Sequence, residues 1–398
     1  MKRAFSLIEL SIVILIIGIL VAGVTQSSRL VSEMRLSSAK RLTQSSPISS
    51  IKGLLLWLET SSDNSFDNNV GDADQVANWY DLNPLSNTKY TLNQSTTANR
   101  PTYIKSSTGG IPALKFNNSK FQIDNFPLNS PSYSMFIVFN SGAVSSSGMD
   151  ILSFSSGGNH GILIEVQPPS GAYLGLNRRL RVLHRSPLGS STENDNYTNA
   201  SSTIEDNKDY IFSYVRNYNA TPTSTTTSSY VGEGGTMSIS TPTGTIISSI
   251  LFASYGLPDT TNWVTTWCHA SGSMSVIQSS CLNRNSCSVG ANNGVFGDPC
   301  GGWGKALAVR YTYSTAGLSS MYLNGNLAND SSYSAANAAG IDSSSISMLI
   351  GNLLPNNSAR PFLGSISEII IFERAVKDEE RKSIEQYLGK KYNIKVSL

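Results

Sequence analysis

The first two dozen residues place the tightest constraint on this chain. Lys2 and Arg3 stand ahead of an apolar run, 5–24. The only charged residue within that run is Glu9. An apolar helix of about 20 residues spans roughly 30 Å, the thickness of a bilayer's hydrocarbon core. Basic residues ahead of such a segment stay on the cytoplasmic side, and an ionisable group inside it is costly enough to indicate a function.

This arrangement resembles the N-terminus of type IV prepilins, which pilins share with the pseudopilins of type II secretion. The resemblance implies a leader, 1–4, with cleavage between Ala4 and Phe5 and N-methylation of Phe5. It also implies that Glu9 acts in pilus assembly by neutralising the amine of a neighbouring Phe5, because paired opposite charges offset a desolvation cost. Ala4 departs from the family, which usually has Gly there.

The alternative for this segment is an ordinary secretory signal peptide cleaved near 20–23, with Glu9 a chance occurrence. Such peptides have an apolar core of 7–15 residues followed by a small-x-small cleavage site. The run here is longer, and its polar residue lies near its start. The prepilin interpretation is therefore preferred.

Composition narrows the range of partners. The chain has 398 residues, a net charge of +2 and 14% charged residues, so it lacks the basic field that holds nucleic acid.

Its cysteines are Cys268, Cys281, Cys287 and Cys300. Clustered cysteines on an exported chain favour disulfides. Zinc is the alternative, although the interval from Cys281 to Cys287 is longer than that of common zinc sites.

Periodicity gives a coarse outline of the elements. A helix is expected over 5–45, with its transmembrane half at 5–24, and Pro47 ends the pattern within a linker, 46–53. Short β-prone runs separated by turn residues then predict a β-sandwich. The runs are 54–58, 113–116, 135–139, 161–164, 180–183, 210–215, 321–325, 348–351 and 366–372. An amphipathic helix, 378–392, closes the pattern.

Several segments resemble the concanavalin A-like, laminin-G-like jelly roll of bacterial surface proteins. They are LLLWLE (54–59), SMFIVFN (134–140), MYLNGN (321–326) and the ending 364–392. In that family the strand corresponding to 210–215 is soon followed by the Tyr-Leu-Asn-Gly turn, whereas about a hundred residues intervene here. We therefore expect an insertion between two sandwich halves, 54–217 and 314–398, with a flexible Thr/Ser-rich connector at 218–235.

The inserted segment, 236–313, resembles the galactose/rhamnose-binding lectin domain of the sea-urchin-egg-lectin (SUEL) type. FASYG (252–256), CHA (268–270), FGDPC (296–300) and the K-x-L-x-V-x-Y of 305–311 carry the resemblance. It implies disulfides Cys281–Cys287 and Cys268–Cys300. Other family cysteines are absent, since Thr241 and Tyr313 occupy their places.

The resemblance also implies a sugar site formed by Tyr255, Asn293, Asp298 and Lys305. Carboxylate, amide and ammonium groups hydrogen-bond vicinal hydroxyls, and an aromatic face packs on sugar C–H groups. Glu233 is the one candidate for the acidic residue that the family places in its first loop. Each of these residues also has a purely structural interpretation: turn, core or solvated strand. Trp263, Trp267 and Trp303 are further aromatic candidates for stacking on a glycan.

Enzymatic activity is not expected. The Glu-x-Asp-x-x-Glu spacing that pairs carboxylates in sandwich glucanases is absent, and Glu368 is expected to stand alone on its strand. His160, His184 and His269 are scattered. No cofactor is expected. The early loop containing Asp63, Asp67, Asp72 and Asp74 offers carboxylates for calcium, with a solvated polar loop as the alternative.

The sequence thus predicts a mainly β protein: a pilin-type transmembrane helix, then a concanavalin A-like sandwich carrying a disulfide-stapled lectin domain. We expect a minor or tip pilin-like subunit whose head binds galactose- or rhamnose-like extracellular glycans for adhesion. Its other partners are the prepilin peptidase, further pilin subunits and, before assembly, the inner membrane. The alternative is a pseudopilin whose lectin fold binds no sugar.

Overall fold

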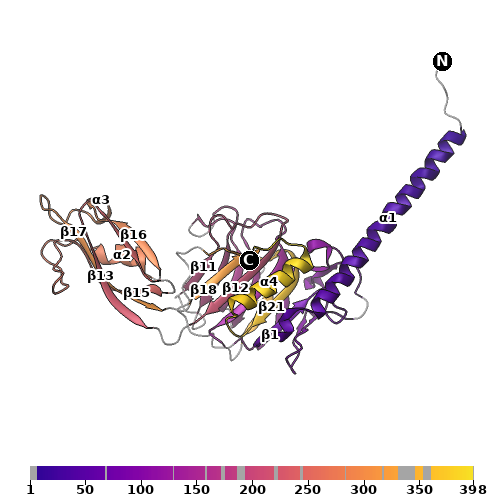
Figure 1. Ribbon diagram of the computed structural model, residues 1–398, viewed down its shortest axis with the longest axis horizontal. Coiled ribbons are helices and arrows are strands. Elements are labelled where there is room, and N and C mark those ends of the chain that lie inside the picture. The colour runs from indigo at the N-terminus through magenta and orange to yellow at the C-terminus, as the bar shows by residue number, and fades with distance from the viewer. Residues whose placement is uncertain are drawn as a thin grey trace, which may run out of the picture.

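The computed structural model has three parts arranged along its long axis (Figure 1). A helical rod projects from one end of a two-sheet sandwich, and a small β module lies at the other end. The structure describes residues 7–67, 70–128, 130–156, 159–171, 175–185, 193–218, 223–242, 245–282, 284–315, 318–329, 346–352 and 360–397. Strands dominate these residues, so the predicted mainly β class is confirmed.

The rod is α1 (Leu7–Gln44), which ends before Pro47 as predicted. Its last turns pack on the sandwich, where Ala39 is buried, and the turn η1 (Pro47–Ser50) buries Ile48 in the same cluster. The expected linker, 46–53, is therefore partly packed.

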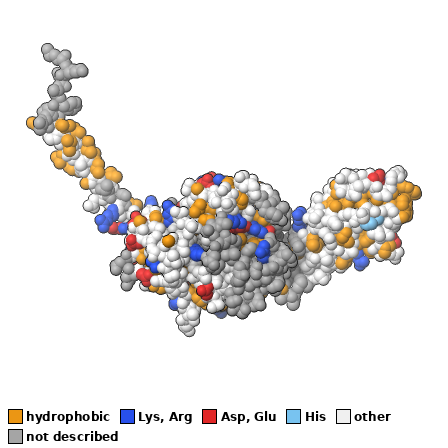
Figure 2. All heavy atoms as spheres, turned by 180° about the vertical axis from the view of Figure 1, so that it is seen from behind, with side chains coloured by type: hydrophobic (Ala, Val, Ile, Leu, Met, Phe, Trp, Pro, Cys, Tyr) orange, Lys and Arg blue, Asp and Glu red, His pale blue; other side chains and the backbone are white. Residues whose placement is uncertain are grey.

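The first half of α1 leaves its apolar side chains uncovered (Figure 2). Those exposed are Ile8, Leu10, Ile12, Val13, Ile14, Leu15, Ile16, Ile17, Ile19, Leu20, Val21 and Val24. Among the described residues, no helix is both long enough and apolar enough to cross a membrane. The cleavage residues Ala4 and Phe5, and the side chain of Glu9, lie outside what the structure describes.

Two eight-stranded antiparallel sheets form the sandwich. The first contains, in spatial order, β19 (Asn326–Leu327), β18 (Leu318–Leu323), β12 (Asp209–Asn217), β7 (Tyr133–Asn140), β21 (Leu363–Phe372), β5 (Ala113–Asn117) and β4 (Thr102–Ile104), with β1 (Leu54–Glu59) also paired to β21. The second contains β11 (Glu193–Tyr197), β10 (Leu180–Arg185), β9 (Asn159–Val166), β8 (Met149–Ser156), β20 (Ser347–Ile350), β6 (Phe121–Ile123), β3 (Thr91–Asn93) and β2 (Asn78–Tyr80). Short 3₁₀ turns are η2 (Thr97–Asn99) and η3 (Thr108–Gly110).

Alternation along the strands builds two cores. On β7, Met135 and Ile137 point into the core between the sheets, whereas Phe136 and Val138 face the opposite side. That opposite face is covered by α4 (Asp378–Tyr392), the predicted closing helix. Figure 1 shows α4 lying across the strands of the first sheet. Every face of β7 is therefore buried, which explains its continuous apolar sequence.

A buried ion cluster joins α4 to this sheet. Glu368 is the single acidic residue of β21, as predicted, and Glu59 of the neighbouring strand β1 lies opposite it in the strand register. Lys391 Nζ lies 2.8 Å from a carboxylate oxygen of each, and all three side chains are fully buried. We call these three residues the buried triad. Trp57 Nε1 (2.7 Å) and Tyr392 Oη (2.9 Å) also donate hydrogen bonds to Glu368.

Within the buried triad, the pKa of Glu59 is lowered and the pKa of Lys391 is raised. Burial by itself raises the pKa of Glu59, but the charge of Lys391 and the hydrogen bonds from Lys391 and Ser61 together outweigh it, so the pKa lies below its usual value. Burial opposes the charged form of Lys391, yet Glu368 and Glu59 raise its pKa well above the ordinary range. Glu59 and Lys391 therefore form an ion pair at neutral pH, and this pair joins α4 to the first sheet.

The small module lies between two strands that pair with each other. β12 and β18 are neighbours in the first sheet, with Phe212 opposite Leu323, and the module occupies the sequence between them. It contains a three-stranded sheet of β13 (Ser224–Gly232), β17 (Ala306–Thr315) and β15 (Thr245–Gly256). A two-stranded sheet of β14 (Thr236–Ser240) and β16 (Ser286–Gly290), with helices α2 (Ser273–Cys281) and α3 (Asn293–Phe296), completes it around a separate core.

The structure corrects the expected flexible connector, 218–235. Half of that segment forms β13, which pairs residue by residue with β17 from Ser224 opposite Ser314 to Gly232 opposite Ala306. Threonine is β-branched and suits a pleated strand, and one edge of β13 has no partner strand among the described residues. The Thr/Ser-rich part of this segment is therefore an exposed edge strand and not a flexible connector.

Candidate functional site

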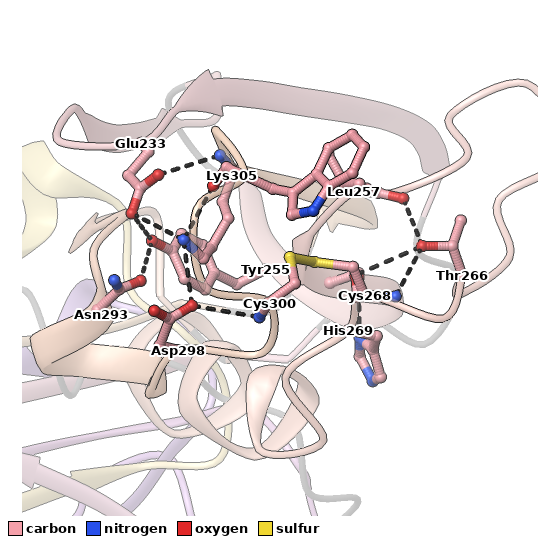
Figure 3. Close-up of a disulfide and its surroundings, with 12 residues drawn as sticks. Glu233, Tyr255, Leu257, Thr266, Cys268, His269, Asn293, Asp298, Cys300 and Lys305 are labelled. Atoms are coloured by element: carbon pink, nitrogen blue, oxygen red, sulfur yellow. Dashed lines mark hydrogen bonds and ion pairs between the residues drawn. A yellow bond between two sulfur atoms is a disulfide. The ribbon is translucent and has the colours of Figure 1, made fainter.

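The ends of several elements in the module converge on one polar cluster (Figure 3). Glu233 follows β13, Tyr255 lies near the end of β15, and Asn293 begins α3. Asp298 lies in the loop after α3, and Lys305 directly precedes β17. The structure therefore brings together all four residues that the resemblance implicates, and adds Glu233 to them.

Tyr255 forms the floor of the cluster. Its ring is fully buried and stacks on Phe296, with the centroids 5.0 Å apart. Its hydroxyl lies 2.8 Å from Asn293 Oδ1 and 3.1 Å from Glu233 Oε1, so its single proton is shared between two acceptors. Burial, followed by the hydrogen bond to Glu233, raises the pKa of Tyr255 to about 12, and the phenol therefore stays a donor.

Lys305 links the two carboxylates of the cluster. Its Nζ lies 3.1 Å from Asp298 Oδ1 and 3.3 Å from Glu233 Oε1, and it donates to the carbonyl of Trp303 at 3.0 Å. Burial works against the charge, but the hydrogen bonds to Asp298 and Glu233 outweigh it and raise the pKa of Lys305. We call Lys305, Asp298 and Glu233 the open triad.

The two ends of the open triad differ in accessibility from its centre. The Lys305 side chain is only 3% exposed, whereas the carboxylates of Glu233 and Asp298 are 32% and 43% exposed. The main-chain N–H of Lys305 donates to Glu233 Oε2 (3.1 Å), and this bond is the largest cause that lowers the pKa of Glu233. The buried side chain of Lys305 thus holds two partly exposed acidic side chains at the surface.

A disulfide and a glycine fix the loops around the cluster. Cys268 pairs with Cys300 and Cys281 with Cys287, so the predicted disulfides are confirmed. The main-chain N–H of Cys300 donates to Asp298 Oδ1 at 3.2 Å. Gly256 has φ +142°, and a Cβ there would lie 2.1 Å from the carbonyl oxygen of Cys268. Only glycine permits this approach of β15 to the disulfide.

This arrangement has the chemistry of a polyol-binding site. Two exposed carboxylates can accept hydrogen bonds from hydroxyl groups, and the side-chain amide of the exposed Asn293 offers donors beside them. Vicinal hydroxyls of a sugar need such alternating partners at short spacing. Water occupies the exposed positions readily, so a ligand must replace its hydrogen bonds to bind.

The remaining candidates do not join this cluster. Asp63 pairs with Lys40, Asp67 accepts from Tyr80 and Asn78, and Asp72 and Asp74 accept main-chain N–H groups. In the part of the chain that the structure describes, no three His, Cys, Asp or Glu side chains are grouped to hold a metal.

The histidines are equally dispersed. His184 Nδ1 lies 3.1 Å from the hydroxyl of Tyr133 in the sandwich, and His269 Nδ1 lies 2.8 Å from that of Ser254 in the module. Burial lowers the pKa of His269. The side chain of His160 lies outside the described set.

Comparisons with known proteins match two segments of the chain. Residues 239–313 match the D-galactoside/L-rhamnose binding SUEL lectin domain. Residues 1–25 match the prokaryotic N-terminal methylation motif. The first match covers every residue of the polar cluster except Glu233, and the second covers Ala4, Phe5 and Glu9.

Similar curated proteins match short parts of this chain. The D-galactoside-specific lectin of Heliocidaris crassispina is 51% identical over 47 residues, which are 12% of this chain and 45% of the lectin. Beta-galactosidase 6 of Oryza sativa subsp. japonica is 41% identical over 68 residues, 17% of this chain and 8% of that protein. The chain thus spans less than half the length of these relatives.

Similarity among solved structures is weak. Trypanosoma rangeli sialidase in complex with sialic acid aligns over 85% of this chain and 33% of its own, with 10% identity and a TM-score of 0.34. A score this low carries no argument about function, and the short match to the beta-galactosidase does not show that this chain is an enzyme. What the comparisons establish is that this chain combines a prokaryotic N-terminal methylation motif with a galactoside/rhamnose-binding SUEL lectin domain.

Proposed function

We propose that this protein is a type IV pilin-like subunit that displays a carbohydrate-binding head for adhesion to glycans. The open triad carries the proposal: a buried lysine presents two exposed carboxylates beside Tyr255 and Asn293. The ligand is a galactose- or rhamnose-like sugar, the class named for the matched domain. This site lies in the module at the far end of the molecule from α1, where a surface fibre would expose it (Figure 1).

The other end of the molecule supports assembly into a fibre. The first half of α1 exposes a continuous set of apolar side chains, and exposed apolar surface of this extent indicates an interaction site. In the proposal the prepilin peptidase removes residues 1–4, Phe5 is methylated, and Glu9 pairs with the new amine of a neighbouring subunit. The same helix holds the chain in the inner membrane by residues 5–24 before assembly.

The sandwich is proposed to be of the concanavalin A-like, laminin-G-like type, from the segments that carry that resemblance. Two packed antiparallel sheets with a closing helix are consistent with it. A head that spans 46–398 is bulky for every position along a thin fibre. A minor or tip subunit is therefore the proposed place.

Sugar binding by the full chain in detergent micelles tests the head. Titration calorimetry with D-galactose and with L-rhamnose should give binding to one of them. Asp298→Ala and Lys305→Ala should each weaken it by at least about tenfold, because each removes a charge-assisted hydrogen bond. Lys52→Ala, an exposed lysine of the sandwich, should bind as the unmodified chain does.

The lectin role would be refuted if calorimetry detected no binding of either sugar. It would also be refuted if neither Asp298→Ala nor Lys305→Ala changed the affinity. They would favour the pseudopilin alternative, in which the head contacts proteins. Mass spectrometry of the native polypeptide tests the other end separately. It should show loss of residues 1–4 and one added methyl group at Phe5. A retained leader, or cleavage near Gly23, would contradict assembly into a fibre.

A further inference from the structure

Two tryptophans stand exposed beside the polar cluster. Trp267 is 71% exposed and Trp303 is 58% exposed, which is unusual for the largest aromatic side chain on a soluble surface. Their ring centroids lie 5.8 Å apart with the planes at 83°. Figure 2 shows apolar side chains gathered at the outer end of the module. The hydrogen bonds of the polar cluster do not account for either indole.

Both tryptophans belong to loops that the site's disulfide ties together. Trp267 directly precedes Cys268, and Trp303 follows Cys300 by three residues. The main-chain N–H of Cys268 donates to the hydroxyl of Thr266 (3.3 Å), which donates to the carbonyl of Leu257 (2.8 Å). These bonds hold the loop that carries Trp267. The main chain at Trp267 is thus held next to the disulfide of the site.

Trp303 is connected directly to the open triad. Its carbonyl oxygen accepts the hydrogen bond from Lys305 Nζ at 3.0 Å, the same ammonium that binds Asp298 and Glu233. The backbone of Trp303 therefore belongs to the polar cluster, and its exposed indole extends from that point. A molecule seated on the exposed carboxylates would have its next part within reach of this aromatic surface.

The perpendicular arrangement leaves indole faces open. In an edge-to-face pair the ring that offers its edge keeps both faces free, and the other ring keeps one. The nearby Trp263 makes a useful contrast, because its ring is packed against Phe252 at 5.6 Å and against the guanidinium of Arg310 at 5.6 Å. Trp263 therefore serves packing, whereas Trp267 and Trp303 form a rigid aromatic corner open to solvent.

We propose that Trp267 and Trp303 form a subsite for the second sugar ring of an oligosaccharide whose terminal residue occupies the polar cluster. The inference rests on the proposed sugar-binding function. Pyranose rings present C–H faces that pack on aromatic faces, and carbohydrate sites combine few polar groups with such surfaces. Because the corner adjoins the open triad, a linked second ring is the occupant that both features accommodate together.

Calorimetry with matched mono- and disaccharides tests the subsite in the full chain. The probes are methyl β-D-galactoside and galactobiose, or the corresponding rhamnosides. The unmodified chain should bind the disaccharide about tenfold more tightly than the monosaccharide. Trp267→Ala and Trp303→Ala should remove most of this difference, while changing the monosaccharide affinity less than twofold. Leu251→Ala, an exposed apolar residue of β15 outside the cluster, is the matched control and should change neither affinity.

Three results would overturn the subsite. If the unmodified chain binds both probes equally, the second ring has no site. If the tryptophan variants weaken both probes alike, the pair only supports the cluster's structure. If they leave both affinities unchanged but abolish self-association in sedimentation, the corner is a protein interface. A chain that binds neither probe refutes the proposed function itself, and this inference with it.

Discussion

Two lysines in this molecule each bridge a pair of carboxylates, and the two triads differ in almost every other respect. The buried triad joins α4 to β1 and β21 inside the sandwich, with all three side chains sealed from solvent. The open triad lies on loops of the module, with its lysine covered and its carboxylates exposed. A lysine between two acidic side chains thus occurs once inside the fold, where it connects α4 to the sheet, and once at the surface.

The two triads differ in how many of their carboxylate oxygens are hydrogen-bonded by protein groups. In the buried triad, Trp57, Tyr387 and Tyr392 add hydrogen bonds to the carboxylate of Glu368, so the remaining acceptor positions are filled by protein. In the open triad the exposed carboxylate oxygens face water, and a ligand can compete for them. Complete internal satisfaction favours stability, and incomplete satisfaction leaves room for recognition.

The largest expected effect is on the buried triad. Lys391→Met leaves two carboxylates buried without their cation and should destabilise the chain by about 3–5 kcal/mol. Lys305→Met should shift the unfolding midpoint little, because its carboxylate partners remain solvated. Urea denaturation followed by tryptophan fluorescence measures both. Equal losses of stability in the two variants would remove the distinction between the triads.

The second expected effect separates the two disulfides of the module. Cys268 and Cys300 are 32 residues apart, and Cys281 and Cys287 are 6 apart. In the chain-entropy account, replacing the first pair by serine costs about 3.7 kcal/mol and the second about 2.2 kcal/mol. Denaturation of the two double variants measures the difference. Only the first replacement should also impair sugar binding, because only that disulfide adjoins the open triad. The reverse order would contradict this placement.

A third prediction concerns a buried carboxyl of the sandwich, Asp150 of β8, which lies opposite Glu165 of β9. Burial, only partly offset by Arg360, raises the pKa of Asp150 to about 8. The unfolded carboxyl titrates near pH 4, so the folded chain binds the extra proton in between. This contribution is complete below about pH 4 and is lost as the pH rises through about 8.

Stability should therefore fall as the pH rises from 5 to 8, by at most the ideal value of about 1.4 kcal/mol per pH unit. Asp150→Asn should abolish most of that fall. Thermal unfolding at several pH values measures it. A stability that does not change between pH 5 and pH 8 in the unmodified chain would contradict this prediction.

The smallest expected effect is on the floor of the open site. Tyr255→Phe keeps the ring that stacks on Phe296 and removes the hydroxyl bonded to Asn293 and Glu233. The loss should be about 1 kcal/mol of hydrogen bonding, seen as a several-fold weaker sugar affinity with an unchanged fold. Calorimetry and circular dichroism measure the two quantities. Full affinity in this variant would show that Tyr255 has only a packing role.

Much of the sandwich could be predicted from local pattern. Apolar β-branched and aromatic runs correctly indicated β7 and β21, and the amphipathic period gave α4 with the bounds 378–392. The connector was wrong because Thr and Ser are compatible with both a loose tether and an exposed edge strand. Only the partner strand, β17, decides between them, and partners are not visible in a local window.

Contacts between charged residues that are far apart in the sequence also could not be predicted from local pattern. Glu59 and Glu368 are far apart in sequence, and only the register of β1 against β21 places them opposite each other. Likewise the cluster residues followed from motif resemblance, but the contact of Glu233 with Lys305 depends on β13 running beside β17. Sequence pattern can therefore identify functional residues. It is less able to predict which of them are in contact.

The most direct test of the account is the position of a bound sugar. A crystal structure of the chain with a galactoside or rhamnoside should show its vicinal hydroxyls hydrogen-bonded to the exposed carboxylates of the open triad, beside Asn293. A sugar bound elsewhere in the molecule, or an open triad that stays occupied only by water at saturating sugar, would contradict it.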